Sequence, residues 1–157
     1  MRKYYWKFMM AKCQQLDFYT KGEKGGAGYF VNYDPEGVNP FARTAPVLRA
    51  FWNKLTDYGN LWFEGRIASG PGDHQLVLSS DREAVAYCSS GTGDEDVRFE
   101  SGMLELRDLA VADGEYIVEI VDPETGVSDT RSVSIGSGKA DLMLPAFTDD
   151  IAVHVYR

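Results

Sequence analysis

Short segments of alternating apolar and polar residues recur from Leu61 to the C-terminus, and this pattern constrains the fold more than any other feature of the sequence. Turn-forming residues separate the segments at intervals of about 8–12 residues, which is typical of an antiparallel β-sandwich or barrel. The first segment places Leu61, Phe63 and Ile67 on one face. The segments that we expect to form strands are 61–67, 75–78, 83–88, 103–107, 115–121, 130–135, 140–144 and 151–156.

One turn and one strand of this series stand out. Residues 122–126 combine Pro123, which fixes φ near -65°, with Gly126, which tolerates positive φ, and so predict a hairpin. Most alternate positions are polar, as expected when one face of each sheet meets water. After Glu115 at its start, the segment 115–121 is apolar on both faces except for Glu119. We therefore expect it to form a central strand, or the strand that docks against the N-terminal part of the chain.

Residues 1–60 differ from the remainder in charge. They contain nine Lys and Arg and five Asp and Glu, a net charge of +4, whereas residues 61–157 contain seven and nineteen, a net charge of -12. This shift predicts two structural units that join near residue 60. The chain is then mainly β with an α-helical N-terminal segment: two helices in residues 1–60 precede an antiparallel β-sandwich of about eight strands in residues 61–157.

The first expected helix covers residues 2 to about 12, with an apolar stripe at helical spacing. The stripe consists of Tyr5, Phe8, Met9 and Cys13. The second helix is expected to begin at Thr44 as its N-cap, with Pro46 in the first turn. Its apolar face consists of Val47, Leu48, Phe51 and Leu55.

A long segment lies between the two expected helices. Residues 14–20 fit either an extension of the first helix or a short strand. Residues 21–43 contain five glycines and two prolines. A loop of this length inside a compact domain is typically functional, or it hides an element that the pattern does not reveal.

The composition excludes several classes of protein. A net charge of -8 disfavours nucleic acid as a partner, because an acidic surface repels phosphate. Apolar runs fall short of the roughly 20 residues that a membrane-spanning helix needs. Lys7 interrupts the apolar stretch near the N-terminus, and Lys12 stands where a cleavage site requires a small residue. We expect a soluble chain with no signal peptide and no contact with a membrane.

The remaining motifs predict neither a metal site nor a cofactor. His74 and His154 are isolated in sequence, and His154 is expected on the outward face of the last strand. Residues 94–96 and 149–150 are acidic but lack the spacing of a calcium loop, so we expect solvated turns. Residues 22–28 are glycine-rich but lack the ending of a phosphate-binding loop.

The two cysteines, Cys13 and Cys88, lie one in each unit. This count does not suggest a disulfide framework. Two buried free thiols are favoured over a bridge between them, and both interpretations stay open.

The order of elements resembles the end of a (β/α)8-barrel glycoside hydrolase followed by its C-terminal β-sandwich. Residues 2–11, from Arg2-Lys3-Tyr4-Tyr5-Trp6 onward, look like the seventh barrel helix, residues 16–19 like the eighth strand, and residues 47–55 like the final helix. Residues 84–87, 114–126 and 144–156 are similar to the trailing domain of several glycosidase families. The likeness is one of pattern and includes no diagnostic catalytic motif.

This resemblance implies a carbohydrate partner and the remainder of a barrel domain as a second partner. Its catalytic carboxyl pair would come from the fourth and seventh strands, before residue 1, so we expect no catalytic pair here, and whether this chain alone is enzymatic stays open. The loop after the eighth strand would form a sugar-binding rim. The residues expected to bind carbohydrate are Asp17, Tyr19, Tyr29, Phe30, Tyr33 and Trp62.

Two alternatives remain open at this point. The loop aromatics could simply pack the loop onto the protein. The whole chain could also be a self-standing, non-catalytic carbohydrate-binding or structural module, in which the two helices cover one sheet and Trp52 or Trp62 forms the binding platform.

Overall fold

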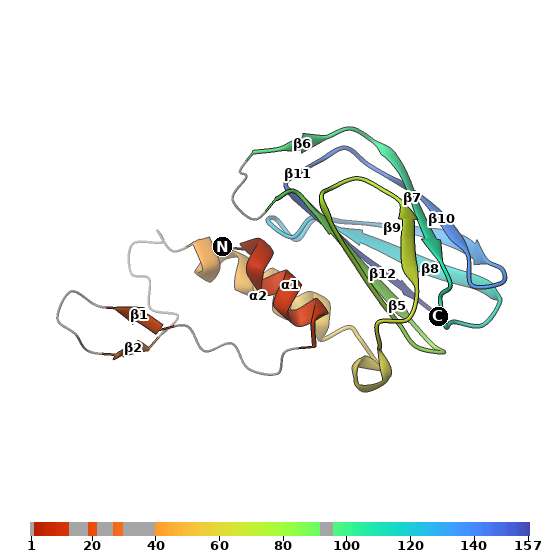
Figure 1. The fold of residues 1–157 in the computed structure, drawn as a ribbon, viewed down its shortest axis with the longest axis horizontal. Coiled ribbons are helices and arrows are strands. Elements are labelled where there is room, and N and C mark those ends of the chain that lie inside the picture. Colours follow the sequence, from red (N-terminus) through yellow and green to blue (C-terminus); the bar gives the residue numbers. More distant parts are fainter. Residues whose placement is uncertain (1, 13–18, 22–26, 30–39, 92–95) are drawn as a thin grey trace.

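A computed structural model describes residues 2–12, 19–21, 27–29, 40–91 and 96–157 (Figure 1). In the N-terminal part it contains helices α1 (Arg2–Met10) and α2 (Pro40–Trp52), strands β1 (Tyr19–Lys21) and β2 (Ala27–Tyr29), and a single 3-10 turn, η1 (Tyr58–Asn60). The strands that follow are β3 (Arg66–Ser69), β4 (His74–Ser79), β5 (Ala84–Ser89), β6 (Arg98–Phe99), β7 (Gly102–Arg107), β8 (Gly114–Val121), β9 (Ser128–Ile135), β10 (Ala140–Leu144), β11 (Phe147–Thr148) and β12 (Asp150–Tyr156).

The C-terminal strands form antiparallel sheets, as the sequence pattern predicts. The largest sheet has the order β4-β5-β12-β8-β9, and a three-stranded sheet has the order β10-β7-β3. A short β11-β6 pair completes the arrangement. Apolar side chains from both larger sheets form one core, which includes Leu104, Leu106, Leu144, Val153 and Val155. The predicted fold class, mainly β with two preceding helices, is confirmed.

The predicted hairpin at residues 122–126 is also confirmed. It joins β8 to β9, whose residues pair in register from Gly114 opposite Ile135 to Val121 opposite Ser128. Gly126 has a φ of +75°, a conformation that few other residues adopt without strain. β8 lies inside the five-stranded sheet, between β12 and β9, so the expectation of a central strand at 115–121 is correct.

The first expected strand, 61–67, is wrong. β3 begins only at Arg66, and Trp62 instead forms an isolated bridge with Ser79. Leu61 is fully buried while Phe63 is 58% exposed, so the two do not share a face. The chain bends at Phe63, between the Trp62 bridge and the start of β3, and this bend interrupts the alternation.

A second core lies between the helices and the outer face of the five-stranded sheet. Trp6 of α1 stacks on Tyr87 of β5 with ring centroids 5.6 Å apart, and meets Phe51 of α2 edge-on at 5.0 Å. The complete cluster comprises Trp6, Met10, Phe51, Leu61, Leu78, Val85, Tyr87, Val121 and Ala152. Figure 1 shows α1 and α2 lying beside this sheet, on the side away from the three-stranded sheet. The five-stranded sheet is therefore buried on both faces at its centre.

The first helix presents a different face from the predicted one. Its buried residues are Lys3, Tyr5, Trp6 and Met10, whereas Phe8 is 37% exposed. The predicted apolar stripe does not include Lys3, whose burial depends on polar partners. The Lys3 ammonium donates a hydrogen bond to the Ser90 hydroxyl at 2.6 Å. Among the stripe residues, Cys13 lies outside the described part of the chain.

The second helix begins earlier than predicted. It starts at Pro40, so Thr44 does not cap it and Pro46 lies in its interior. A proline there removes one backbone hydrogen bond, and packing of the helix on the sheet compensates for that loss. The predicted apolar face is correct, because Val47, Leu48, Phe51 and Leu55 all contact the second core.

The long segment between the helices contains a small hairpin. β1 and β2 pair antiparallel, with Tyr19 opposite Tyr29. The strand alternative for residues 14–20 thus applies at Tyr19 and Thr20, while residues 14–18 lie outside the described part. In the portions of the chain that the structure describes, no helix is long and apolar enough to cross a membrane.

Candidate functional site

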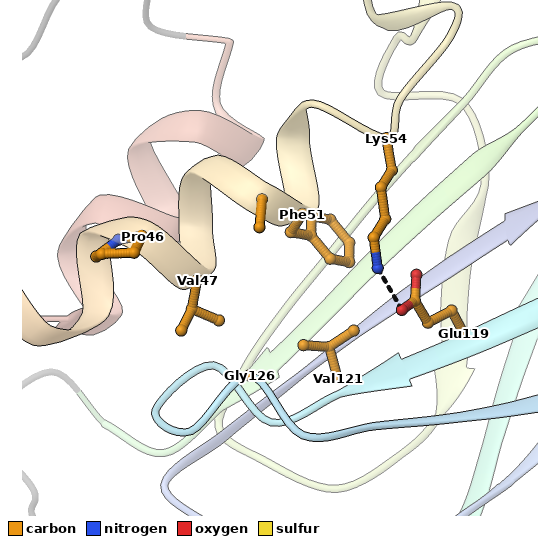
Figure 2. Close-up of a pocket in the computed structure, with 8 residues that line it drawn as sticks. Pro46, Val47, Phe51, Lys54, Glu119, Val121 and Gly126 are labelled. Atoms are coloured by element: carbon orange, nitrogen blue, oxygen red, sulfur yellow. Dashed lines mark hydrogen bonds and ion pairs between the residues drawn. The ribbon is translucent and has the colours of Figure 1, made fainter.

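A groove lies between helix α2 and strand β8 (Figure 2). It has a volume of about 240 Å³, and its walls are mainly apolar. The side chains of Val47 and Phe51 project from the helix toward Val121 of the sheet. The residues that line the groove are Pro46, Val47, Ala50, Phe51, Lys54, Glu119, Val121 and Gly126.

The two ends of the groove differ in chemistry. At one end the β8–β9 turn approaches the helix so closely that a Cβ at Gly126 would lie 3.2 Å from a methyl carbon of Val47. At the other end the Lys54 ammonium contacts a Glu119 carboxylate oxygen at 2.5 Å. The Glu119 side chain is 7% exposed and that of Lys54 is 51% exposed. The groove is thus an apolar hollow that ends in a largely buried carboxylate with a half-exposed ammonium partner.

A second buried carboxylate lies on the same sheet face. Glu83 accepts hydrogen bonds from the backbone N–H groups of Asp57, at 2.5 Å, and Thr56, at 3.3 Å. It also contacts Nε2 of His154 at 2.9 Å. Since Thr56 and Asp57 lie a few residues after the end of α2, Glu83 fastens the connector between the helices and the sandwich to the sheet.

His154 is a neighbour of both of these glutamates. It pairs with Glu119 across β12 and β8, and it packs edge-on against Phe51 with centroids 6.0 Å apart. Burial lowers the pKa of His154, and the nearby Glu83 and Glu119 only partly oppose that effect. His154 does face away from the sandwich core, as predicted, but it is 2% exposed because the helices cover this face. Within the described residues, its Nδ1 has no hydrogen-bond partner.

The paired acids at 149–150 are not a solvated turn, which corrects the sequence-based expectation. Arg2 binds the buried Asp150 carboxylate through Nε and Nη2, and the Tyr87 hydroxyl donates to the same group at 2.7 Å. Lys3 pairs with Asp149 at 3.4 Å. Burial raises the pKa of Asp150, although Arg2 opposes this shift. These carboxylates anchor the first turn of α1. No cluster of metal-ligating side chains occurs in the ranges that the structure describes.

Trp62 lies on the surface, apart from the groove. Its ring is 58% exposed, and the Lys12 ammonium stands 4.6 Å from its centroid. The same ammonium donates to three backbone carbonyls, including that of Leu61 at 2.6 Å. Lys12 therefore occupies one face of the ring. Trp52 is partly exposed and packs edge-on against Phe51 and Tyr58, and its role as a platform stays a prediction.

The other predicted carbohydrate-binding residues are not brought together with this groove by any described contact. Tyr19 and Tyr29 pair across the β1–β2 hairpin. Asp17, Phe30 and Tyr33 lie outside the described residues. All of these assignments, together with Trp62, stay predictions. Glu23 and the acidic residues Asp94 and Glu95 also fall outside, whereas Cys88 is a buried free thiol whose pKa burial raises to about 12.

Sequence reasoning did not identify the groove. Glu119 was visible as the single charged position in residues 116–121, and this was the available signal. Lys54 gave no comparable signal in the sequence, because a lysine near the end of a helix is common. Their pairing spans 65 residues of sequence and depends on how α2 docks.

Comparisons with known proteins identify the fold alone. No protein-family model and no curated protein matches this chain. Among solved structures, the chain is similar to one described as a glycoside hydrolase, with a TM-score of 0.52 and 11% sequence identity. The match covers 86% of this chain and 30% of that one. The chain therefore has a glycoside hydrolase-like fold and spans less than a third of the length of the protein that it resembles.

Proposed function

We propose that this chain is the C-terminal portion of a carbohydrate-active glycoside hydrolase. In this proposal, the sandwich braces a catalytic barrel through α1 and α2, or helps to hold polysaccharide near it. The catalytic carboxyl pair belongs to the remainder of that protein. The observation that carries the proposal is the structural similarity, which covers 86% of this chain. Residues 61–157 make up a smaller share of the chain, so the similarity extends into residues 1–60.

The packing of the helices supports a bracing role. A sandwich that merely followed a catalytic domain on a linker would keep the outer faces of its sheets polar. Here the outer face of the five-stranded sheet is apolar and lies against Trp6, Met10 and Phe51. Ionic contacts of Arg2 and Lys54 with β12 and β8 add to this attachment. Such an interface would transmit the position of the sandwich to any domain that is continuous with the helices.

The test has two parts. The reading frame that precedes the Met1 codon should encode alternating strands and helices in phase with this chain. The purified chain should hydrolyse none of a panel of aryl glycosides and soluble polysaccharides, because it lacks the proposed catalytic pair. An upstream frame without such elements would refute the barrel attachment, and hydrolysis by the pure chain would refute the assignment of catalysis to another region.

A further inference from the structure

The ion pair at the end of the α2–β8 groove selects among ligands by charge. An anionic ligand that approached Lys54 would meet the Glu119 carboxylate, which lies 2.5 Å from the ammonium. A cationic ligand would have to displace Lys54 from a buried acid. A neutral hydroxyl group is not repelled by Glu119 and does not have to displace Lys54. It accepts a hydrogen bond from an ammonium and donates one to a carboxylate. The pair therefore favours a neutral, hydroxyl-bearing group.

The remaining walls of the groove favour a ligand with an apolar face. Val47, Phe51 and Val121 present carbon atoms, and the exposed Pro46 and Ala50 extend this surface outward. Sites for small molecules commonly combine such walls with a few placed polar groups. The volume of about 240 Å³ lies below the range of roughly 300–1,000 Å³ that drug-sized ligands occupy. It suits one ring rather than an extended chain.

We propose that this groove is a binding subsite for a single neutral sugar ring. The ring lies with its C–H face on Pro46, Val47 and Ala50, beside the buried Phe51 and Val121, and two of its hydroxyl groups bridge Lys54 and Glu119. The subsite is separate from Trp62 and from the β1–β2 hairpin. This inference rests on the proposed function for its choice of a carbohydrate among neutral hydroxyl compounds.

The experiment uses the full chain with isotopic labelling and a panel of neutral methyl glycosides. Backbone amide shifts are recorded during titration, and we expect movement in residues 46–54 and 119–126 with dissociation constants of about 1 mM. Ala50→Leu places extra carbon atoms in the groove and should weaken binding about tenfold, equivalent to about 1.4 kcal/mol. Ala11→Leu, a matched change at an exposed position just after the other helix, should leave binding unchanged.

Charged analogues provide the second arm. The matching uronic acid and amino sugar should bind more weakly than the neutral glycoside, because each conflicts with one member of the Lys54–Glu119 pair. Tighter binding of either charged form would overturn the proposed selection. Shifts confined to the surroundings of Trp62 would overturn this subsite while leaving carbohydrate binding by the chain intact. Absence of shifts with every glycoside would also overturn it, whereas the bracing role is decided separately by the upstream reading frame.

Discussion

His154 lies where the helices, their connector and the sheet meet, and its burial links the stability of the chain to pH. Burial lowers its pKa in the folded protein below the ordinary value of 6.5. In the unfolded chain the same imidazole binds a proton near pH 6.5, so acidification favours unfolding. The loss of stability begins as the pH falls through 6.5 and continues until the lower folded pKa is reached.

We therefore expect the free energy of unfolding, measured with urea, to fall between pH 7 and pH 5. His154→Gln keeps an N–H donor for Glu83 but does not titrate, so it should flatten this dependence. Asp149 does not contribute to the change over this pH range, because its lowered pKa places its protonation in the folded protein below pH 3.8. An unchanged slope in the variant would show that another group is responsible for the pH dependence.

At the scale of elements, Trp6 is the largest buried side chain through which α1 packs on the sheet. Trp6 is 1% exposed and lies between Tyr87 and Phe51. Trp6→Ala should lower the free energy of unfolding by about 3–5 kcal/mol, because it leaves a large cavity in the second core. Tyr4→Ala is the matched control, since Tyr4 lies on the same helix and is 45% exposed; its effect should be within about 0.5 kcal/mol.

The Trp6→Ala variant should also become more sensitive to proteolysis near residues 53–60, because α1 helps to hold this connector. Lys12, just after α1, donates to the carbonyls of Tyr58, Gly59 and Leu61. Urea unfolding and limited proteolysis measure the two effects independently. Equal losses of stability in the Trp6 and Tyr4 variants would contradict the assigned packing.

The elements also show where sequence reasoning succeeds. Alternation and turn chemistry located most sandwich strands and the hairpin at Gly126, because both signals are local. The same alternation placed His154 outside the sandwich core, which is right, but a covered outer face looks the same in sequence as a solvated one. The burial of Lys3 and of the 149–150 pair depends on partners about 150 positions apart, such as Arg2 and Asp150. No local pattern contains that information.

At the scale of the whole molecule, two cores share one sheet. β5 is buried at all six of its positions, because the sandwich interior covers one face and the helices cover the other. A chain reduced to residues 61–157 would expose the second face, including Leu78, Val85 and Tyr87. An apolar patch of this kind on a soluble domain binds dyes and promotes association. The N-terminal segment therefore acts as a structural layer of the molecule.

We expect residues 61–157 alone to bind a hydrophobic dye and to associate with increasing concentration in sedimentation experiments. The full chain should do so less, since Trp6, Met10 and Phe51 cover the patch. Replacing Val85 and Tyr87 by threonine in the shortened chain should reduce both effects, because β-branched polar residues suit an exposed strand. A shortened chain that stays monomeric and keeps the unfolding midpoint of the full chain would mean that the helices contribute nothing to stability. The sandwich would then be independent, and the helices could not serve as a brace.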